Sequence, residues 1–244
     1  MQQIFISNDK KQDDTVLIEG QDAMHLSKVL RMRPGEKIRI STESGESFIG
    51  ELTELSKDSV KATILEKAYE TELSNKIYLF QALPKGDRME TVIEKVVELG
   101  VTEIIPVQMK YCVAKPDEKK KENRLKRYQA IAESAAKQSK RSVIPKVGEF
   151  MSFKEAADLA LSMDICLVPY ENKEGMGPTG DALKKVTPGK SISVVIGPEG
   201  GFAGEEIEYF EGKADIVSLG RRILRTDTAA ITALSLIMLQ SELA

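Results

Sequence analysis

The chain is poor in the residues that usually bind metal ions. It has one histidine, His25, and two cysteines, Cys112 and Cys166, which stand too far apart to form a C-x-x-C pair. Structural zinc sites take four cysteine and histidine ligands, mostly in closely spaced pairs. One chain cannot assemble such a site here, so we expect no bound metal. Both cysteines are expected to be buried as small hydrophobic side chains.

Long apolar runs are also missing. The first residues, MQQIFISNDKKQDD, lack the apolar segment of a signal peptide, and the stretch AAITALSLIML near the end is too short to cross a bilayer. We therefore expect a cytoplasmic protein that does not bind membranes. Hydrophobic residues make up 41% of the chain and charged residues 30%, a balance that excludes disordered and collagen-like proteins.

Two common phosphate-binding motifs are absent or misplaced. The segment GPEGGFAGEE has neither the lysine nor the Ser/Thr of a Walker loop. The segment GMGPTG (175–180) has the dinucleotide-binding spacing G-x-G-x-x-G, but residues 171–174 separate it from the preceding apolar run and include two acids. Because acids would repel a pyrophosphate, a flexible loop is the simpler interpretation. A nicotinamide-dependent enzyme stays as an alternative function.

Positive charge is concentrated in one stretch of an acidic chain. The formal net charge is −3, yet residues 115–141 hold ten basic and four acidic residues, a local charge of +6. A smaller basic group lies near the N-terminus and comprises Lys28, Arg31, Arg33, Lys37 and Arg39. Clustered positive charge on an acidic protein is typical of contact with a nucleic-acid backbone. A solvated helix face would explain the charge equally well.

The first 72 residues are expected to form a small β-rich domain. Five short runs are rich in β-branched residues and bounded by Gly, Asn, Asp and Ser, namely IFIS, TVLIEG, EKIRIST, ESFIGELTEL and SVKATIL. One helical pattern, QDAMHLSKVLRM, interrupts them, and its apolar residues follow helical spacing at Met24, Leu26, Val29, Leu30 and Met32. We predict a small β-barrel with one helix, and a polar linker over about residues 70–76.

Residues 73–244 alternate between strand and helix patterns. The strand-like runs are IYLFQAL, TEIIPVQ, DICLVPY, ISVVIG and DIVSLG. The helical segments include a basic helix over about residues 121–139, with an apolar stripe at Leu125, Tyr128, Ala132 and Ala135. This alternation predicts an α/β domain with a mostly parallel sheet. Ligands of such sheets bind beyond the carboxyl ends of the strands, which points to the loops after DICLVPY, SVVIG and DIVSLG.

The loop in VVIGPEGGF suits a ligand that is read by the backbone. Gly197, Gly200 and Gly201 carry no Cβ, so the chain can turn sharply or approach a ligand closely. With no cation and one acid, Glu199, the loop would accept an adenine ring linked to a positively charged sulfonium. A tight turn with Glu199 before a helix would fit as well.

The next loop, LGRRILRTDTAA, places three arginines ahead of a helix. The N-cap of that helix is expected at Thr226 or Asp227. In a purely structural loop these arginines would pair with nearby acids.

Five separated blocks carry a family pattern along the whole chain. They are HLSKVLRMRPGE, LPKGDRMETVIEKVVELGVTEIIP, ESAAKQSKRSVIPKV, IGPEGGFAGEEIE and LGRRILRTDTAA. In this order they resemble the RsmE-type ribosomal RNA methyltransferases of the SPOUT superfamily. Two positions depart from the family pattern: Asp227 stands where Glu is expected, and Arg221 where proline or a small residue is frequent.

The resemblance implies both the fold and the cofactor. It implies a PUA-like β-barrel that binds RNA over residues 1–72, and a SPOUT-type α/β domain with a trefoil knot and a mostly parallel sheet over residues 73–244. The implied cofactor is S-adenosylmethionine. Its implied binding residues come from the three loops and are Leu167, Pro169, Ile196, Gly197, Pro198, Glu199, Gly200, Gly201, Leu219, Gly220, Ile223 and Leu224.

The resemblance also implies a homodimer. The terminal segment AAITALSLIMLQ is apolar nearly all round, which indicates a helix buried on more than one face. A second subunit would cover the outer face. Burial within one chain is the alternative.

The implied reaction is methylation of N3 of a uridine in 16S ribosomal RNA of the small subunit, near the decoding centre. N3 carries a proton at neutral pH, so a base or an anion-stabilising group is needed. We expect Arg225 to stabilise the uracil anion and Glu199 to orient the cofactor or accept the proton. His25 is expected to be structural or to contact RNA.

RNA phosphates are expected to contact Arg31, Arg33, Lys85, Arg127 and Arg141. A non-catalytic RNA-binding protein that kept the knot is the alternative function.

Overall fold

The computed structural model describes residues 1–56 and 58–244. These residues divide into two compact units. The N-terminal unit comprises Met1–Glu72 and Ala136–Ile144, and the C-terminal unit comprises Leu73–Ala135 and Pro145–Ala244. None of the helices in the described part of the chain combines the length and apolar character needed to span a membrane.

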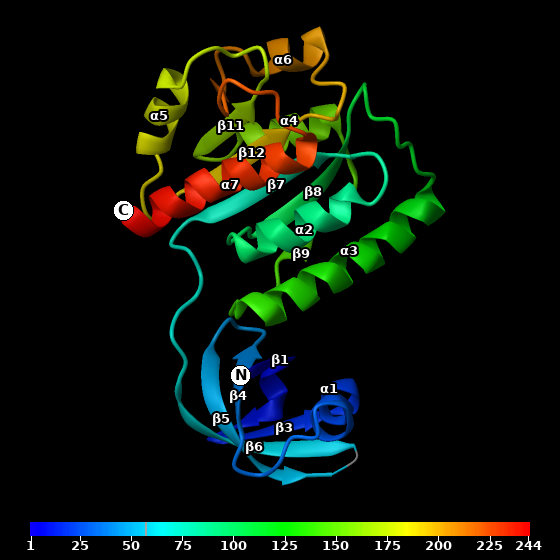
Figure 1. The fold of residues 1–244 in the computed structure, drawn as a ribbon, viewed down its shortest axis with the longest axis vertical. Coiled ribbons are helices and arrows are strands. Elements are labelled where there is room, and N and C mark those ends of the chain that lie inside the picture. Colours follow the sequence, from blue (N-terminus) through cyan, green and yellow to red (C-terminus); the bar gives the residue numbers. More distant parts are fainter. Residues whose placement is uncertain (57) are drawn as a thin grey trace. The chain divides into compact units, whose positions relative to one another are not determined.

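A six-stranded sheet builds the N-terminal unit (Figure 1, blue to cyan). Its strands are β1 (Gln2–Ile6), β2 (Lys11–Gln12), β3 (Thr15–Glu19), β4 (Lys37–Thr42), β5 (Ser47–Leu55) and β6 (Ser59–Lys67), in the order β1-β4-β5-β6-β3-β2. A 3-10 turn, η1 (Asn8–Lys10), follows β1. The first strand runs parallel to β4, and the other neighbours are antiparallel. Alternate residues such as Val16 and Ile18 enter the core, where they join Leu52.

The helix predicted for this unit is shorter than expected and changes its winding. An α-helical turn, α1 (Gly20–Met24), passes into a π-helical turn, η2 (His25–Val29). Leu26 is buried, whereas Met24, Val29 and Leu30 are exposed. The apolar residues that follow helical spacing therefore do not share one buried face. The wider π turn rotates the residues that follow it away from the face on which they would lie in an α-helix.

Buried polar bonds attach residues 136–144 to the N-terminal unit. Arg141 is only 5% exposed, and its Nε and Nη2 lie 2.9 and 2.5 Å from Oε2 of Glu72. The amide of Ser142 donates to the other oxygen of the same carboxylate, and its hydroxyl accepts from the fully buried Arg39. Removing one partner of a buried ion pair costs about 3–5 kcal/mol, so this cluster holds the segment firmly.

A parallel sheet forms the centre of the C-terminal unit. Its strands are β7 (Lys76–Ala82), β8 (Glu103–Gln108), β9 (Lys146–Val147), β10 (Met151–Ser152), β11 (Ile165–Pro169), β12 (Ser191–Ile196) and β13 (Asp215–Val217). The order is β10-β8-β7-β12-β11-β13, and β9 also pairs with β8. All these pairs are parallel, which confirms the predicted sheet type.

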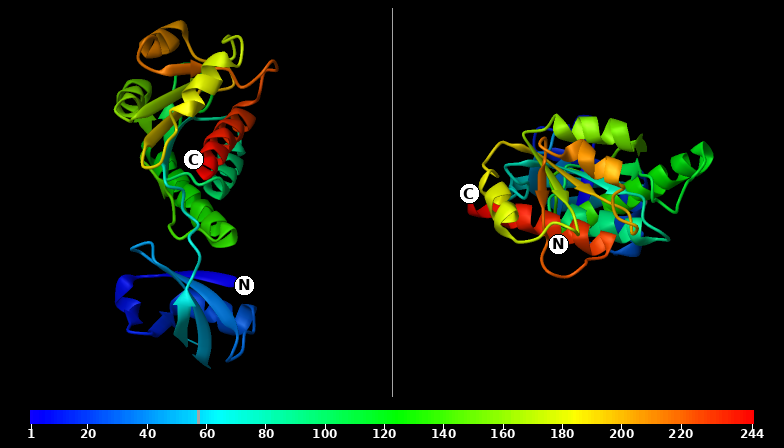
Figure 2. Two further views of the ribbon diagram at one scale, coloured as in Figure 1. Left: turned by 90° about the vertical axis from the view of Figure 1, so that its left-hand side faces the viewer. Right: turned by 90° about the horizontal axis from the view of Figure 1, so that it is seen from above.

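Helices cover both faces of this sheet. The helices after residue 73 are α2 (Arg88–Glu98), α3 (Glu118–Ser139), α4 (Phe153–Leu161), α5 (Gly177–Lys184), α6 (Gly204–Phe210) and α7 (Thr226–Leu243), and residues 136–139 of α3 belong to the N-terminal unit. Helices α2 and α7 lie side by side on one face, and α4 and α6 pack on the other (Figures 1 and 2). Because both faces are covered, β11 and β12 are buried along nearly their whole length.

Two helices bear on specific predictions. The basic helix α3 is confirmed and begins three residues earlier than expected, with Tyr128, Ala132 and Ala135 buried and Leu125 half-buried. The segment GMGPTG, interpreted as a flexible loop, is helical from Gly177, where α5 begins. Pro178 in the first turn favours that start, because a proline there loses no helical hydrogen bond.

Candidate active site

A cavity of about 460 Å³ lies at the carboxyl ends of β11, β12 and β13. Three loops line it, one after each strand, as expected for a parallel sheet. All of the predicted cofactor residues except Leu167 line this cavity. Leu167 is buried in β11 instead, with its nearest strand neighbours on β12 and β13.

The cavity is also lined by residues that the sequence did not indicate as cofactor-binding. They are Tyr170, Glu171, Phe202, Ser218, Arg221, Arg222, Thr226 and Ala229, together with the predicted catalytic residue Arg225. Most of them adjoin a residue that was assigned, so the neighbourhood of each glycine- or arginine-rich motif was the available signal. Ala229 adjoins no assigned residue and had no such signal.

A chain of hydrogen bonds fixes the loop after β12 to the first turn of α7. The hydroxyl of Thr226 donates to the carbonyl oxygen of Gly197 at 2.8 Å, and Nε2 of Gln81 donates to the same hydroxyl at 3.0 Å. Both side chains are buried, so water is a poor substitute for either partner. The bonds connect β7, β12 and α7 at the floor of the cavity.

Glu199 is held by the loop that follows β7 and by the first residue of α2. Its Oε1 accepts from the amide of Lys85 at 2.9 Å and from Nη1 of Arg88 at 2.7 Å. Burial by itself would raise the pKa of this carboxyl, but the hydrogen bonds from Lys85, from its own amide and from Arg88, with the charge of Arg88, outweigh burial and lower the pKa. Glu199 is therefore ionised at neutral pH and already accepts two hydrogen bonds.

Two glycines that line the cavity have a positive φ, a backbone conformation that other residues rarely adopt. Gly201 has a φ of +73°, and a Cβ there would collide with the carboxylate of Glu171. Gly220 has a φ of +117°. Side chains rarely adopt such angles, so both positions favour glycine.

The arginine-rich loop presents its charges to solvent beside the cavity. Arg221, Arg222 and Arg225 are exposed, and within the described residues none of them forms an ion pair with an acid. Ile223, in the same loop, is 86% exposed. The N-cap of α7 is Arg225, so the expectation of a cap at Thr226 or Asp227 is wrong by one or two residues.

The residues predicted to bind RNA differ in their exposure. Arg31 and Arg33 are exposed on the N-terminal unit, and Lys85 is exposed on the C-terminal unit. Arg127 is also exposed but pairs with Glu90 at 2.8 Å. Arg141 is buried against Glu72, so the structure removes it from the accessible surface, and Arg39 of the N-terminal basic group is buried as well.

Comparison with known proteins reveals the relatives of this chain. A family model described as an RNA methyltransferase domain matches residues 71–238, and one described as an RNA methyltransferase PUA domain matches residues 18–65. The ribosomal RNA small subunit methyltransferase E of Bacillus subtilis is 38% identical over 251 residues, covering 100% of this chain and 98% of that protein. The chain belongs to the methyltransferase E family.

Other members of the methyltransferase E family agree with this assignment. The enzyme of Mycobacterium bovis is 29% identical over 89% of this chain and 84% of its own length. The solved structure of methyltransferase E from Neisseria gonorrhoeae, bound to S-adenosyl methionine, has a TM-score of 0.79 and 33% identity and covers 96% of each chain. The predicted architecture, a PUA-like domain followed by a mostly parallel α/β methyltransferase domain, is confirmed. S-adenosylmethionine, the predicted cofactor, is present in this relative.

Proposed function

We propose that this protein transfers the methyl group of S-adenosylmethionine to N3 of a uridine in 16S ribosomal RNA, near the decoding centre. One observation carries the proposal: the glycine-rich and arginine-rich loops of a methyltransferase E chain converge on a single cavity at the carboxyl ends of β11, β12 and β13. The site of transfer on the base rests on the family resemblance. The coarser activity, RNA methylation, rests on the family itself.

The cavity fits the proposed cofactor. Its 460 Å³ lies within the range of roughly 300–1,000 Å³ typical of small-molecule sites. At Gly197 and Gly200 an added Cβ would approach Phe202 and Tyr111 to 3.0 Å, so the loop presents bare backbone at both positions and any larger residue would have to displace a neighbour. The eleven predicted residues that line the cavity, from Pro169 to Leu224, would hold the cofactor, which supplies an electrophilic methyl group when bound.

Arg225 is proposed to stabilise the uracil anion. N3 becomes nucleophilic only when its proton leaves, and the negative charge then spreads over the ring. The guanidinium of Arg225 is exposed at the rim of the cavity and has no acid partner among the described residues, so its charge is available to a substrate.

Glu199 is proposed to orient the cofactor loop. Its lowered pKa makes it a weak proton acceptor. Its carboxylate also already accepts hydrogen bonds from Lys85 and Arg88, which fix the position of the loop. The orienting role predicted for Glu199 is therefore favoured over the role of proton acceptor.

RNA phosphates are proposed to contact exposed arginines and lysines of each unit. Because N3 is on the pairing edge of the base, the target must be unpaired or extruded before transfer. Arg31, Arg33, Lys85 and Arg127 would contact phosphates and position the RNA. Arg141 is left out, since it is already paired inside the N-terminal unit.

The protein is proposed to act as a cytoplasmic homodimer with a knotted C-terminal domain. Helix α7 buries Ala230, Leu234 and Ile237, yet Leu239 and Leu243 remain exposed near its end. A second subunit covering this helix would bury that apolar surface. The small ribosomal subunit is the proposed partner, in keeping with the names of the relatives.

Calorimetric titration tests the cofactor assignment directly. We expect saturable binding of S-adenosylmethionine to the purified protein and no binding of NAD. Binding of NAD alone would support a nicotinamide-dependent enzyme and overturn the proposal. As a matched pair, Gly201→Val should abolish the binding of S-adenosylmethionine, whereas Gly212→Val, at an equally positive φ of +68° outside the cavity, should retain it.

A further inference from the structure

Tyr111 is an aromatic residue whose ring is left open to solvent. Within the described residues, Tyr69 and Tyr111 are the most exposed aromatic side chains, at 66% and 48%. The ring of Tyr69 is covered by the guanidinium of Arg39, 4.8 Å from the ring centre. No aromatic ring, no cation over the face and no hydrogen bond to the hydroxyl is found for Tyr111 in the described part of the chain. Its face is therefore available.

Tyr111 lies directly beside the cofactor loop. A Cβ added to Gly200 would stand 3.0 Å from Cβ of Tyr111, so the two residues are in contact. Gly200 lines the cavity, and Tyr111 comes from the loop after β8. In the sheet, β8 and β7 lie on one side of β12, and β11 and β13 lie on the other. Tyr111 and the cavity therefore share the loop after β12 but approach it from opposite sides.

The position of Tyr111 is fixed by its neighbours. The buried carboxylate of Glu206 accepts from the amide of Lys110 at 2.9 Å and from the amide of Ala203 at 2.8 Å. Cys112, on the other side of Tyr111, is buried, and its amide donates to the carbonyl of Met109. The loop after β8 is thus bonded to the first turn of α6 on one side of Tyr111 and anchored in the core on the other.

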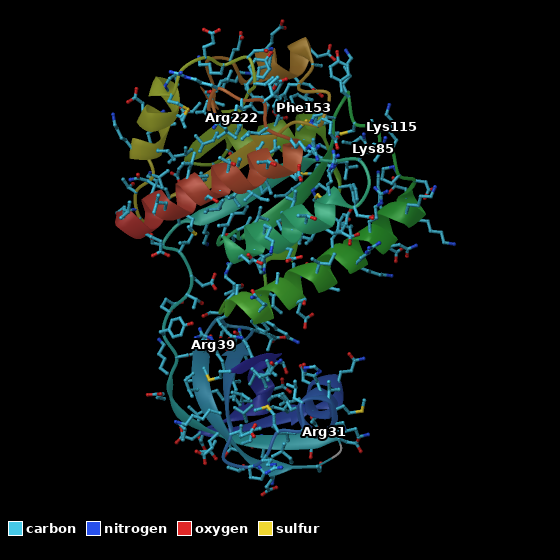
Figure 3. All side chains as sticks on the ribbon, viewed as in Figure 1. Arg31, Arg39, Lys85, Lys115, Phe153 and Arg222 are labelled. Atoms are coloured by element: carbon cyan, nitrogen blue, oxygen red, sulfur yellow. The ribbon has the colours of Figure 1, made fainter. Side chains whose placement is uncertain are left out.

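Two exposed lysines, Lys85 and Lys115, lie on the loops after β7 and β8. Lys115 lies on the same loop as Tyr111, and the amide of Lys85 binds Glu199, the neighbour of Gly200. Both lysine side chains are exposed, and Figure 3 shows them at the same edge of the sheet. Within the described residues, neither ammonium group forms an ion pair. A bare aromatic ring on the same loop as an unpaired lysine is typical of a surface that binds an unstacked nucleotide.

We propose that Tyr111 is the platform on which the target base stacks while its methyl group is transferred. The inference rests on the proposed transfer to a base, because a base must leave its stack in the RNA to reach the cofactor. The ring of Tyr111 replaces the lost stacking partner. Because Gly200 carries no side chain, Tyr111 packs directly against the backbone of the loop that lines the cavity. Lys85 and Lys115 hold the flanking phosphates.

Steady-state kinetics on unmodified small ribosomal subunits test the platform. Tyr111→Ala should lower kcat/KM for RNA roughly ten- to hundredfold, the loss expected for one stacked base. Tyr111→Phe keeps the ring and should stay within about twofold of wild type. Val113→Ala, at an exposed position of the same loop, is the matched control and should have no effect. All variants should bind S-adenosylmethionine as wild type does.

A fluorescent version of the experiment reads stacking without turnover. The chain has no tryptophan, so Tyr111→Trp introduces a single reporter at the platform. Oligouridylate should quench this reporter, because a stacked base quenches indole fluorescence, and should leave a Val113→Trp control unquenched. Binding of the oligonucleotide would be followed in parallel by anisotropy of a labelled strand.

The outcomes separate this inference from the proposed function. Wild-type kcat/KM in Tyr111→Ala, or no quenching of Tyr111→Trp at saturating oligouridylate, would overturn the platform. Loss of S-adenosylmethionine binding in Tyr111→Ala would also overturn it, since the residue would then only support the loop. If wild-type protein transfers no methyl group, the proposed function fails, and quenching at position 111 still supports a base-stacking site.

Discussion

Thr226 connects three elements at the floor of the active site through one hydroxyl group. Thr226→Val should lower the free energy of unfolding by about 1–3 kcal/mol, because the carbonyl of Gly197 and the amide of Gln81 each lose a buried partner. The matched control is Thr228→Val, at an exposed position two residues on in the same helix. Urea denaturation measures both. Equal stabilities of the two variants would contradict the role of this hydroxyl.

Arg225 should matter for the chemical step. Arg225→Ala should lower kcat about 10²- to 10³-fold, the loss typical of a group that stabilises an anionic transition state. Arg225→Lys should restore part of the rate, and neither change should alter the affinity for S-adenosylmethionine more than a few-fold. Single-turnover assays on small ribosomal subunits measure the effect. Arg222→Ala, on the same exposed loop, should alter KM for RNA more than kcat; unchanged turnover in both Arg225 variants would refute the assignment.

Sequence patterns predicted the residues of the cavity better than their bonds. The glycine- and arginine-rich loops carry a local chemical signal, so all but one of the cofactor residues named from the sequence line the cavity. The partners of Glu199 lie on the loop after β7 and at the start of α2, more than a hundred residues earlier, and no local pattern pairs them. The prediction that Arg141 contacts RNA failed for the same reason. Its charge suggested a surface residue, but an acid distant in sequence, Glu72, allows it to be buried.

Among the secondary-structure elements, β11 and β12 are joined at their starts by one carboxylate, that of Asp164. Asp164 Oδ2 accepts from the amide and hydroxyl of Ser191, and Oδ1 pairs with Lys190. These bonds lower the pKa of Asp164 from 3.8 to about 2. A lowered pKa stabilises the fold above the unfolded value, and this stabilisation is lost as pH falls toward the folded value.

Asp164→Asn should therefore be less stable than wild type at pH 7, and the difference should shrink between about pH 4 and pH 2. Thermal unfolding at a series of pH values measures it. The control Asp181→Asn removes a carboxylate that pairs only with Lys184 on the surface, and should differ little from wild type throughout. A difference between Asp164→Asn and wild type that is the same at pH 7 and pH 2.5 would contradict this role of the carboxylate.

Element types were predictable where apolar periodicity was strong. The strands and helices after residue 73 alternate clearly, because strands buried on both faces read as continuous apolar runs. The helix near residues 20–32 was misread for a physical reason. Its spacing fits an α-helix, but the chain adopts a π-helical turn at His25–Val29, and a π turn carries no spacing signal of its own. The attachment of residues 136–144 to the N-terminal unit depends on buried polar bonds, which periodicity does not report.

At the scale of the whole molecule, the exposed basic residues should make RNA binding depend on salt concentration. The basic residues that remain exposed include Arg31 and Arg33 on the N-terminal unit and Lys85 on the C-terminal unit, although the net charge is −3. Charge reversal of Arg31 and Arg33 to Glu should weaken RNA binding and make it less dependent on salt. The slope of log K against log salt concentration should become shallower by roughly 0.7–0.9 for each phosphate that the protein no longer neutralises. Cofactor affinity should not change. Lys184→Glu, at a surface position outside the cavity, is the control. An unaltered salt slope in the Arg31 and Arg33 variant would show that these arginines do not contact RNA phosphates.

The most direct test of the central claim follows the methyl group itself. Small ribosomal subunits from cells lacking this protein would be incubated with it and with isotopically labelled S-adenosylmethionine, and the 16S RNA would be digested and analysed by mass spectrometry. We expect one labelled nucleoside, 3-methyluridine, at a single position of the RNA. No label in the RNA, or label on a ribose or another base, would contradict the proposed reaction.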